Sequence, residues 1–269
     1  LTGVQGVTQV NVATVESVVI NGLGGNDTLT TTTPAGTRTV TLTPGSTPDS
    51  GGVRVDSLVP MSFTNLGVGV ASQVLLTDAD ANDTFVYLGT GANDSFTVNV
   101  AGTVRLNSQV LVDPSQAAVL TVKGLEGQDA FGVSGGTAYT TVNVEGDGPD
   151  TGDVLTIDTP TTPPPAVTVD FGNARISGYL GAAANYVNFS GLETINADTG
   201  GKLIAFIDTA GDDRLVATIL DNVSGVVQAN AAAPVVNYSN NGGNYVDFQF
   251  AAGAGQDTLA VRGNALAQL

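Results

Sequence analysis

The 269-residue sequence contains no cysteine, no histidine and no tryptophan. Without Cys and His, the chain has no thiol nucleophile, no Ser-His-Asp triad and no typical zinc site. No apolar run approaches the 18 residues of a membrane-spanning helix, so we expect no membrane insertion. The start of the chain shows no charged and apolar segments of a signal peptide, which predicts either a removed signal or a segment of a longer protein.

Positive charge is also scarce. Only 8 residues are Lys or Arg, against 25 Asp and Glu, and the formal net charge is −17. A surface of this charge repels phosphate groups, so we expect no nucleic-acid partner and no attraction to anionic membranes. Divalent cations and neutral glycans stay open as partners.

Aromatic residues make up 6% of the chain, whereas Gly, Val and Thr are abundant. β-Branched side chains pack well on pleated surfaces and are stiff in helices. Apolar and polar residues alternate in residues 38–44, 96–106 and 166–171, which is typical of strands with one packed face. The sequence therefore predicts an all-β fold.

The stretch VVINGLGGNDTLT at residues 18–30 recurs along the chain. Similar combinations of strand, glycine-rich turn and strand occupy 86–98, 120–133 and 246–261. The matching aspartates are Asp27, Asp83, Asp94, Asp129, Asp153, Asp213 and Asp257. Such repetition favours a β-solenoid or parallel β-helix. Because the spacing is irregular, serial β-sandwich domains are the alternative.

One segment interrupts the repeats: DTPTTPPPAV at 158–167 is too rich in proline for a helix or a central strand. The sequence therefore predicts a β-repeat domain at 1–158 and a Pro-rich loop or linker at 159–166. Residues 167–269 then form either a second β-repeat domain or a continuation of the first.

The segments VESVVINGLGGNDTLT (15–30) and FSGLETI (189–195) resemble the β-strand repeats of very long secreted bacterial proteins. Those repeats are distantly similar to the haemolysin-type (RTX) calcium repeats. The resemblance implies a β-solenoid, an extracellular or cell-surface location, and a structural or adhesive role. The RTX nonapeptide is matched once, by GLGGNDTL at 22–29, and no copy follows nine residues later, so a stacked calcium ladder does not follow from it.

Acidic loops supply the candidate metal ligands. The loop at 77–83 begins like an EF-hand, but Asp stands at its sixth position where Gly is required, and residue 89 is Gly where a bidentate Glu is required. The loop at 145–153 crowds four carboxylates into nine residues. The candidate Ca²⁺ ligands are Asp27, Asp78, Asp80, Asn82, Asp83, Asp147, Asp150 and Asp153. The alternative is that these side chains only close turns by accepting backbone N–H groups. We expect no other cofactor.

Three functions remain in view. The leading hypothesis is a structural subunit of an extracellular fibre, surface layer or biofilm matrix, in which copies of the chain associate through strand edges. The alternative is an adhesin or carbohydrate-binding module of a large surface protein. A polysaccharide-active β-helix would need acidic and basic residues gathered in one groove, and the eight basic residues form no such pattern in the sequence, so we expect no enzyme.

Overall fold

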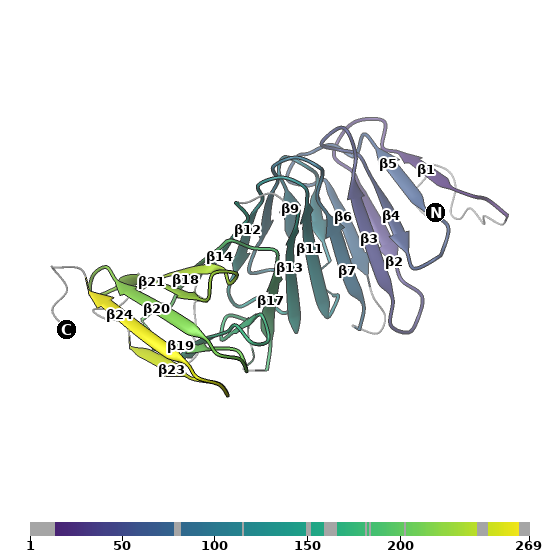
Figure 1. The fold of residues 1–269 in the computed structure, drawn as a ribbon. Coiled ribbons are helices and arrows are strands. Elements are labelled where there is room, and N and C mark those ends of the chain that lie inside the picture. Colours follow the sequence, from purple (N-terminus) through teal and green to yellow (C-terminus); the bar gives the residue numbers. More distant parts are fainter. Residues whose placement is uncertain are drawn as a thin grey trace.

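The computed structural model describes residues 14–77, 82–114, 116–148, 152–158, 166–180, 182, 184–201, 203–240 and 247–263. Within these ranges the chain forms 24 strands and no helix. The strands build two 12-stranded sheets that pack against each other (Figure 1). The predicted all-β fold is confirmed. The described ranges contain no helix long and apolar enough to cross a membrane.

The two sheets share the strands equally. The first sheet contains, in spatial order, β1 (Val18–Asn21), β5 (Met61–Thr64), β4 (Gly51–Val55), β3 (Thr39–Pro44), β7 (Thr84–Leu88), β11 (Val119–Leu125), β13 (Thr141–Asp147), β17 (Tyr186–Ser190), β16 (Arg175–Ser177), β15 (Ala166–Asp170), β19 (Leu203–Ile207) and β23 (Phe248–Ala251). The second contains β2 (Thr28–Thr32), β6 (Gln73–Thr77), β10 (Leu111–Asp113), β9 (Val104–Leu106), β8 (Ser95–Val98), β12 (Ala130–Ser134), β14 (Val154–Asp158), β18 (Thr194–Asp198), β22 (Val235–Ser239), β21 (Ser224–Ala229), β20 (Arg214–Ile219) and β24 (Thr258–Gly263).

The chain alternates between the sheets, and most neighbouring strands are parallel. At four places it instead forms an antiparallel meander of three strands within one sheet, namely β3–β4–β5, β8–β9–β10, β15–β16–β17 and β20–β21–β22. Each meander runs backwards along the stack, so its third strand pairs in parallel with an earlier strand, such as β5 with β1. The meanders lie in the first and second sheets in turn.

This order of strands occurs twice. Strands β1–β12 and β13–β24 have the same sequence of single strands and meanders and the same pairings. The register also agrees. Val18 of β1 lies opposite Met61 of β5, and the equivalent residue of β13, Val142, lies opposite Val187 of β17. We call β1–β12 the N-terminal repeat and β13–β24 the C-terminal repeat. The Pro-rich segment joins β14 to β15 inside the C-terminal repeat, and both sheets contain strands from each side of it.

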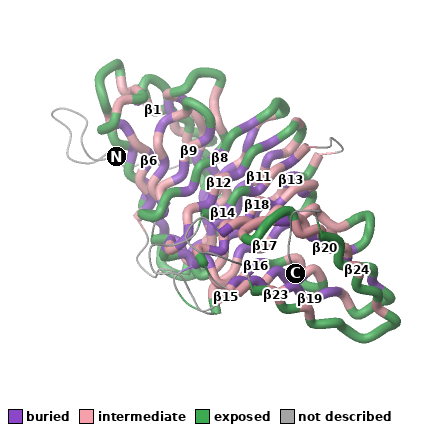
Figure 2. The backbone as a smooth tube through the Cα atoms, turned by 90° about the vertical axis from the view of Figure 1, so that its left-hand side faces the viewer, coloured by how far each residue is buried: buried purple, intermediate pink, exposed green. Residues whose placement is uncertain are grey.

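The hydrophobic core lies between the two sheets. Inward-facing residues alternate with outward-facing ones along almost every strand, as the purple and pink segments show (Figure 2). Aromatic rings stack through the core. In the N-terminal repeat, the ring centroids of Phe96 and Phe131 lie 5.5 Å apart. Phe206 and Phe250 lie 5.7 Å apart in the C-terminal repeat. The core is therefore one continuous layer, which is built from equivalent positions in successive strands.

The two repeats meet where β11 pairs with β13 and β12 pairs with β14. We call this contact the middle junction. The inward-facing pairs are Leu120–Val142, Val122–Val144, Phe131–Leu155 and Val133–Ile157. All eight side chains are at most 1% exposed. The first repeat thus ends on a surface that the start of the second repeat covers completely.

Candidate functional site: the aspartate corners

Aspartates mark the corners at which the chain leaves the first sheet and enters the second. Six of the seven aspartates matched by the sequence pattern directly precede a strand of the second sheet: Asp27, Asp94, Asp129, Asp153, Asp213 and Asp257. Asp83 differs, because it precedes β7 of the first sheet. The repeated sequence motif therefore encodes one kind of corner on one side of the molecule.

Hydrogen bonds within a corner fix the turn. Thr90 donates its backbone N–H and its hydroxyl to Asp94 Oδ2, over 2.5 and 3.0 Å. Asn107, from the adjacent meander, donates its side-chain amide to Asp94 Oδ1 over 2.6 Å. The carboxylate thus satisfies backbone and side-chain donors that would otherwise lack partners in the turn.

The same corner recurs in the C-terminal repeat. Thr209 donates its N–H and its hydroxyl to Asp213 Oδ2, over 2.9 and 2.6 Å, and Asn230 donates to Asp213 Oδ1. The agreement of these hydrogen bonds, atom for atom, supports the equivalence of the two repeats.

Successive corners are linked into a ladder across the middle junction. The backbone N–H of Asp94 donates to Asp129 Oδ1 over 2.8 Å, and the N–H of Asp129 donates to Asp153 Oδ1 over 2.7 Å. The N–H of Asp153 in turn donates to Glu193 Oε2 over 2.8 Å. Hydrogen bonds to a carboxylate are stronger than neutral ones. The ladder therefore fastens β8, β12, β14 and β18 along one side of the second sheet.

The carboxylates of this ladder differ in their pKa. Burial, followed by the nearby charges of Asp153 and Asp94, raises the pKa of Asp129 to about 6. Asp129 Oδ2 has no hydrogen-bond partner among the described residues, and Leu125 stands at the position that Thr90 and Thr209 occupy in the Asp94 and Asp213 corners. In contrast, the hydrogen bond from the Thr209 side chain lowers the pKa of Asp213. The hydroxyl of Thr209 is the largest cause of the lowered pKa at Asp213, and the Asp129 corner has no threonine at that position.

One corner gathers three carboxylates. Oxygen atoms of Asp208, Asp213 and Asp257 lie within 4.8 Å of one another. Burial and the charges of the other two raise the pKa of Asp208, whose Oδ1 also accepts the N–H of Gly253. Three carboxylates are ligands of the kind that Ca²⁺ prefers. The sequence prediction did not include Asp208, because Gly89 occupies the equivalent position in the N-terminal repeat.

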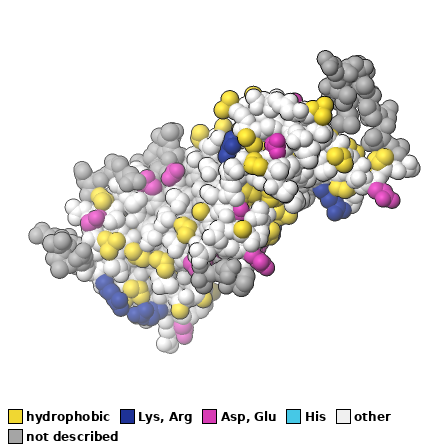
Figure 3. Space-filling model, turned by 90° about the horizontal axis from the view of Figure 1, so that it is seen from above, with side chains coloured by type: hydrophobic (Ala, Val, Ile, Leu, Met, Phe, Trp, Pro, Cys, Tyr) yellow, Lys and Arg dark blue, Asp and Glu magenta, His cyan; other side chains and the backbone are white. Residues whose placement is uncertain are grey.

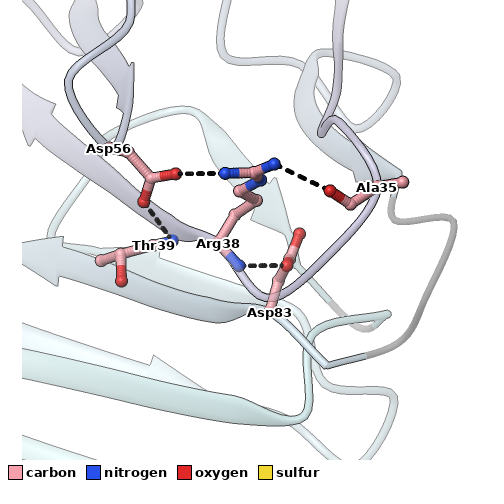
Figure 4. A network of polar contacts seen from close by, with 5 residues as sticks. All are labelled: Ala35, Arg38, Thr39, Asp56 and Asp83. Carbon is pink, nitrogen blue, oxygen red and sulfur yellow. Dashed lines mark hydrogen bonds and ion pairs between the residues drawn. The ribbon is translucent and has the colours of Figure 1, made fainter.

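The predicted calcium ligands make separate interactions. Asp83 is fully buried, and its Oδ1 accepts the backbone N–H of Arg38 over 2.7 Å (Figure 4). Asp147 lies 4.0 Å from Lys123 Nζ, whereas Asp153 belongs to the ladder. Asp78, Asp80 and Asp150 lie outside the described residues. Asn82 precedes Asp83, and Asp27 precedes β2, at the edge of the second sheet. Among the described side chains, none of the predicted ligands joins a group of three acidic residues. The calcium site stays a prediction.

The meanders are held by a second recurrent contact. Thr39 donates its N–H to Asp56 Oδ1 over 2.9 Å, and the Arg38 guanidinium contacts Asp56 and the carbonyl of Ala35 (Figure 4). In two other meanders, Asn107 and Asn230 accept the corresponding N–H. All three acceptors have positive φ, a conformation that Asp and Asn tolerate better than other residues with a side chain.

Amides also connect the strands on the outer faces. Asn188 donates to Asn143 over 2.8 Å on the first sheet, and Asn143 donates to Thr121 over 2.9 Å. On the second sheet, Asn237 donates to Asn196 over 2.9 Å. Two of these asparagines, Asn188 and Asn237, begin Asn-x-Ser sequons in the sequence, and the structure shows both within hydrogen-bonded amide rows.

The hollows on the outer faces are shallow. A hollow of about 410 Å³ lies over β3–β5, and one of about 280 Å³ lies over β14, β18 and β22. Acidic side chains are scattered over the face seen in Figure 3 and do not gather in one place. Neither hollow contains a group of three acidic side chains among the described residues.

Comparison with protein-family models, with curated proteins and with solved structures found no significant match. The argument for function therefore rests on the chain itself.

Proposed function

We propose that this chain is a structural module, a two-sheet β-solenoid with inserted meanders, that joins other copies of itself in an extracellular or cell-surface assembly. The observation that carries the proposal is that both sheets end, at both ends of the molecule, in strands whose outer edges are open among the described residues. β1 and β24 lie at opposite ends (Figure 1).

The N-terminal end exposes backbone donors and apolar side chains. Val18 donates its N–H to Pro60, and Gly22 donates to Thr64, so both N–H groups point towards β5. Successive backbone N–H groups of a strand point to opposite sides within the sheet. The N–H groups of Val19 and Asn21 therefore point away from β5, towards the open edge. Val19 is 69% exposed. An edge strand that has no neighbour on its outer side among the described residues, and no charged residue within β1, is suited to pairing with another strand.

The C-terminal end has the same character. Thr258 donates its N–H to Asp213, so the N–H groups of Leu259 and Val261 point away from β20. These two apolar side chains are 48% and 51% exposed. Half-exposed residues at positions that continue the core are expected where another layer of protein binds.

The interior supports the same role. Hydrogen bonds of carboxylates at the corners, and of amides on both outer faces, connect neighbouring strands of each sheet. They support the stacking of successive strands. The charge of −17 keeps such a repetitive surface soluble and discourages lateral sticking. The location outside the cell comes from the resemblance of the repeats to those of secreted bacterial proteins.

Sedimentation velocity and electron microscopy of the purified chain test the proposal. We expect the mean particle mass to rise with protein concentration, in both CaCl₂ and EDTA. A chain that stays monomeric at every concentration in both buffers would contradict it. Binding of such a monomer to a glycan array would instead support the carbohydrate-binding module.

A further inference from the structure

We propose that copies associate head to tail, with β23 and β24 of one copy pairing in parallel with β1 and β2 of the next, in the register of the middle junction. This inference rests on the proposed function and names its partner and its contact surface. The middle junction already shows how the end of one repeat receives the start of another.

The equivalence of the repeats fixes the register. β23 and β24 correspond to β11 and β12, and β1 and β2 correspond to β13 and β14. At the middle junction Val122 lies opposite Val144, and Phe131 lies opposite Leu155. Between two copies, the same alignment is expected to place Phe250 opposite Ile20 and Leu259 opposite Leu29. On the outer face it places Gln249 opposite Val19.

Burial at equivalent positions supports the contact. Val133 and Phe131 of β12 are 1% exposed, whereas their counterparts Val261 and Leu259 of β24 are about half exposed. At the other end, Ile20 is partly buried, whereas its counterpart Val144 is 0% exposed. These side chains are apolar at both ends although nothing described covers their outer sides. A second copy would bury them as the middle junction does.

The open end of the core is hollow. A cavity of about 210 Å³ at the C-terminal end is lined by apolar residues of β20, β23 and β24, among them Leu215, Phe250 and Leu259, and by Asp208 and Asp257. At the middle junction, side chains of β13 and β14 pack against the equivalent positions. The alignment brings Ile20 and Leu29 of the next copy to this cavity.

The aspartate ladder also continues across the proposed contact. At the middle junction, Asp129 donates its N–H to Asp153 Oδ1, and Val154 donates to the Asp129 carbonyl over 2.8 Å. Asp257 and Asp27 are the counterparts of Asp129 and Asp153. The acceptor at the middle junction is Oδ1 of Asp153, and Oδ1 of Asp27 is the equivalent atom. In the proposed contact Asp27 accepts the N–H of Asp257 from the neighbouring copy.

Charge permits this contact in spite of the net charge of the chain. The described strands β1, β2 and β23 contain no charged residue, and Arg262 is the only one in β24. The aligned strands therefore place no like charges opposite each other, which would be destabilising. At the corner, Asp27 and Asp257 come together as Asp153 and Asp129 do at the middle junction. The chain itself supplies both surfaces, and a second copy is accordingly the partner that fits.

Cysteine cross-linking tests the register, because the chain has no cysteine of its own. Chains carrying Val19→Cys are mixed with chains carrying Gln249→Cys and treated with a mild oxidant or a short bis-maleimide. We expect cross-linked dimers in the mixture and none in either variant alone. The pair Val19→Cys and Ala251→Cys, two residues out of register, is expected to cross-link far less. The double variant Thr121→Cys and Asn143→Cys is the positive control at the middle junction.

Blocking each end separately tests the direction. Val19→Pro removes an N–H from the open edge of β1, where proline is tolerated. Leu259→Lys places a charge on β24, at the C-terminal end. Each variant alone is expected to be monomeric, and the mixture is expected to form dimers and nothing larger. Val100→Lys, at an exposed turn away from both ends, is the control that should assemble as the parent does. Circular dichroism verifies that each variant folds.

The outcomes separate the two proposals. If the parent assembles and both blocked variants still assemble alone, the head-to-tail contact is wrong and the structural function stands. If Val19→Cys cross-links to itself, the copies meet face to face and the direction is wrong. If the parent never assembles, the proposed function is wrong as well.

Discussion

The middle junction and the two ends of the molecule display the same surface in two states. In the middle, Val133 of β12 is 1% exposed because β14 lies beside it, whereas at the end Val261 of β24 is 51% exposed. Both are valines at equivalent positions of the two repeats. The difference shows that burial at these positions is decided by the neighbouring strand rather than by the residue or its local pattern.

The largest expected effect comes from charging these two valines. Val133→Lys places an unpaired charge in the core, and we expect a loss of more than about 4 kcal/mol in the free energy of unfolding. Val261→Lys leaves its ammonium group in water, and we expect a loss below about 1 kcal/mol. Urea denaturation of dilute monomer measures both. Equal losses would mean that the two repeats are not equivalent in the folded chain.

The aspartate ladder allows a similar comparison. Asp153→Ala removes the acceptor of the buried Asp129 N–H, and we expect a loss of about 1–3 kcal/mol in unfolding free energy. Asp27→Ala removes a carboxylate whose Oδ2 has no hydrogen-bond partner among the described residues, so the monomer should lose less than about 1 kcal/mol. Its assembly should weaken. The account fails here if Asp27→Ala costs the monomer as much as Asp153→Ala.

Two corners are expected to respond to pH in opposite directions. The pKa of Asp129 is raised to about 6, so its contribution to stability is present at low pH and is lost as the pH rises through about 6. The pKa of Asp213 is lowered, so its contribution is present near neutral pH and is lost as the pH falls towards that lowered value. Asp129→Asn should therefore gain in melting temperature relative to the parent between pH 5 and 7, whereas Asp213→Asn should be less stable than the parent at pH 7. Melting curves in chelator and in CaCl₂ provide the check, and parallel curves for the two variants would refute it.

The smallest expected effect concerns an ion pair. Lys123 and Glu145 form a salt bridge across the middle junction, and the equivalent residues at the ends are Ala251 and Asn21. The double variant Asn21→Glu and Ala251→Lys should transfer this pair to the contact between copies. An exposed pair is worth at most about 1 kcal/mol, so we expect the Kd of association to fall by no more than about fivefold at low salt. Sedimentation at high salt should abolish the gain.

The sequence was sufficient to predict strands and corners. Alternation in residues such as 38–44 predicted one buried face, and the Gly-Asp motif predicted turns that are followed by strands. It could not predict the meanders. An antiparallel strand and a parallel strand show the same alternation of apolar and polar residues, because side-chain direction does not depend on the partner.

The duplication escaped sequence reasoning for a related reason. Equivalent positions such as Phe131 and Leu259 share only an apolar character. The equivalent loops of the two repeats also differ in length. The Asp208 cluster was missed because glycine stands at the equivalent position in the other repeat. Only the pairing of strands brings these positions into correspondence.

The axial repeat of the assembled protein tests the central claim most directly. Twelve strands per sheet at about 4.8 Å give a repeat of about 58 Å along the stack, with strands perpendicular to it. Electron microscopy of assembled particles should show this spacing, with all copies pointing the same way. A repeat near twice that length, with neighbouring copies in opposite orientations, would contradict the account.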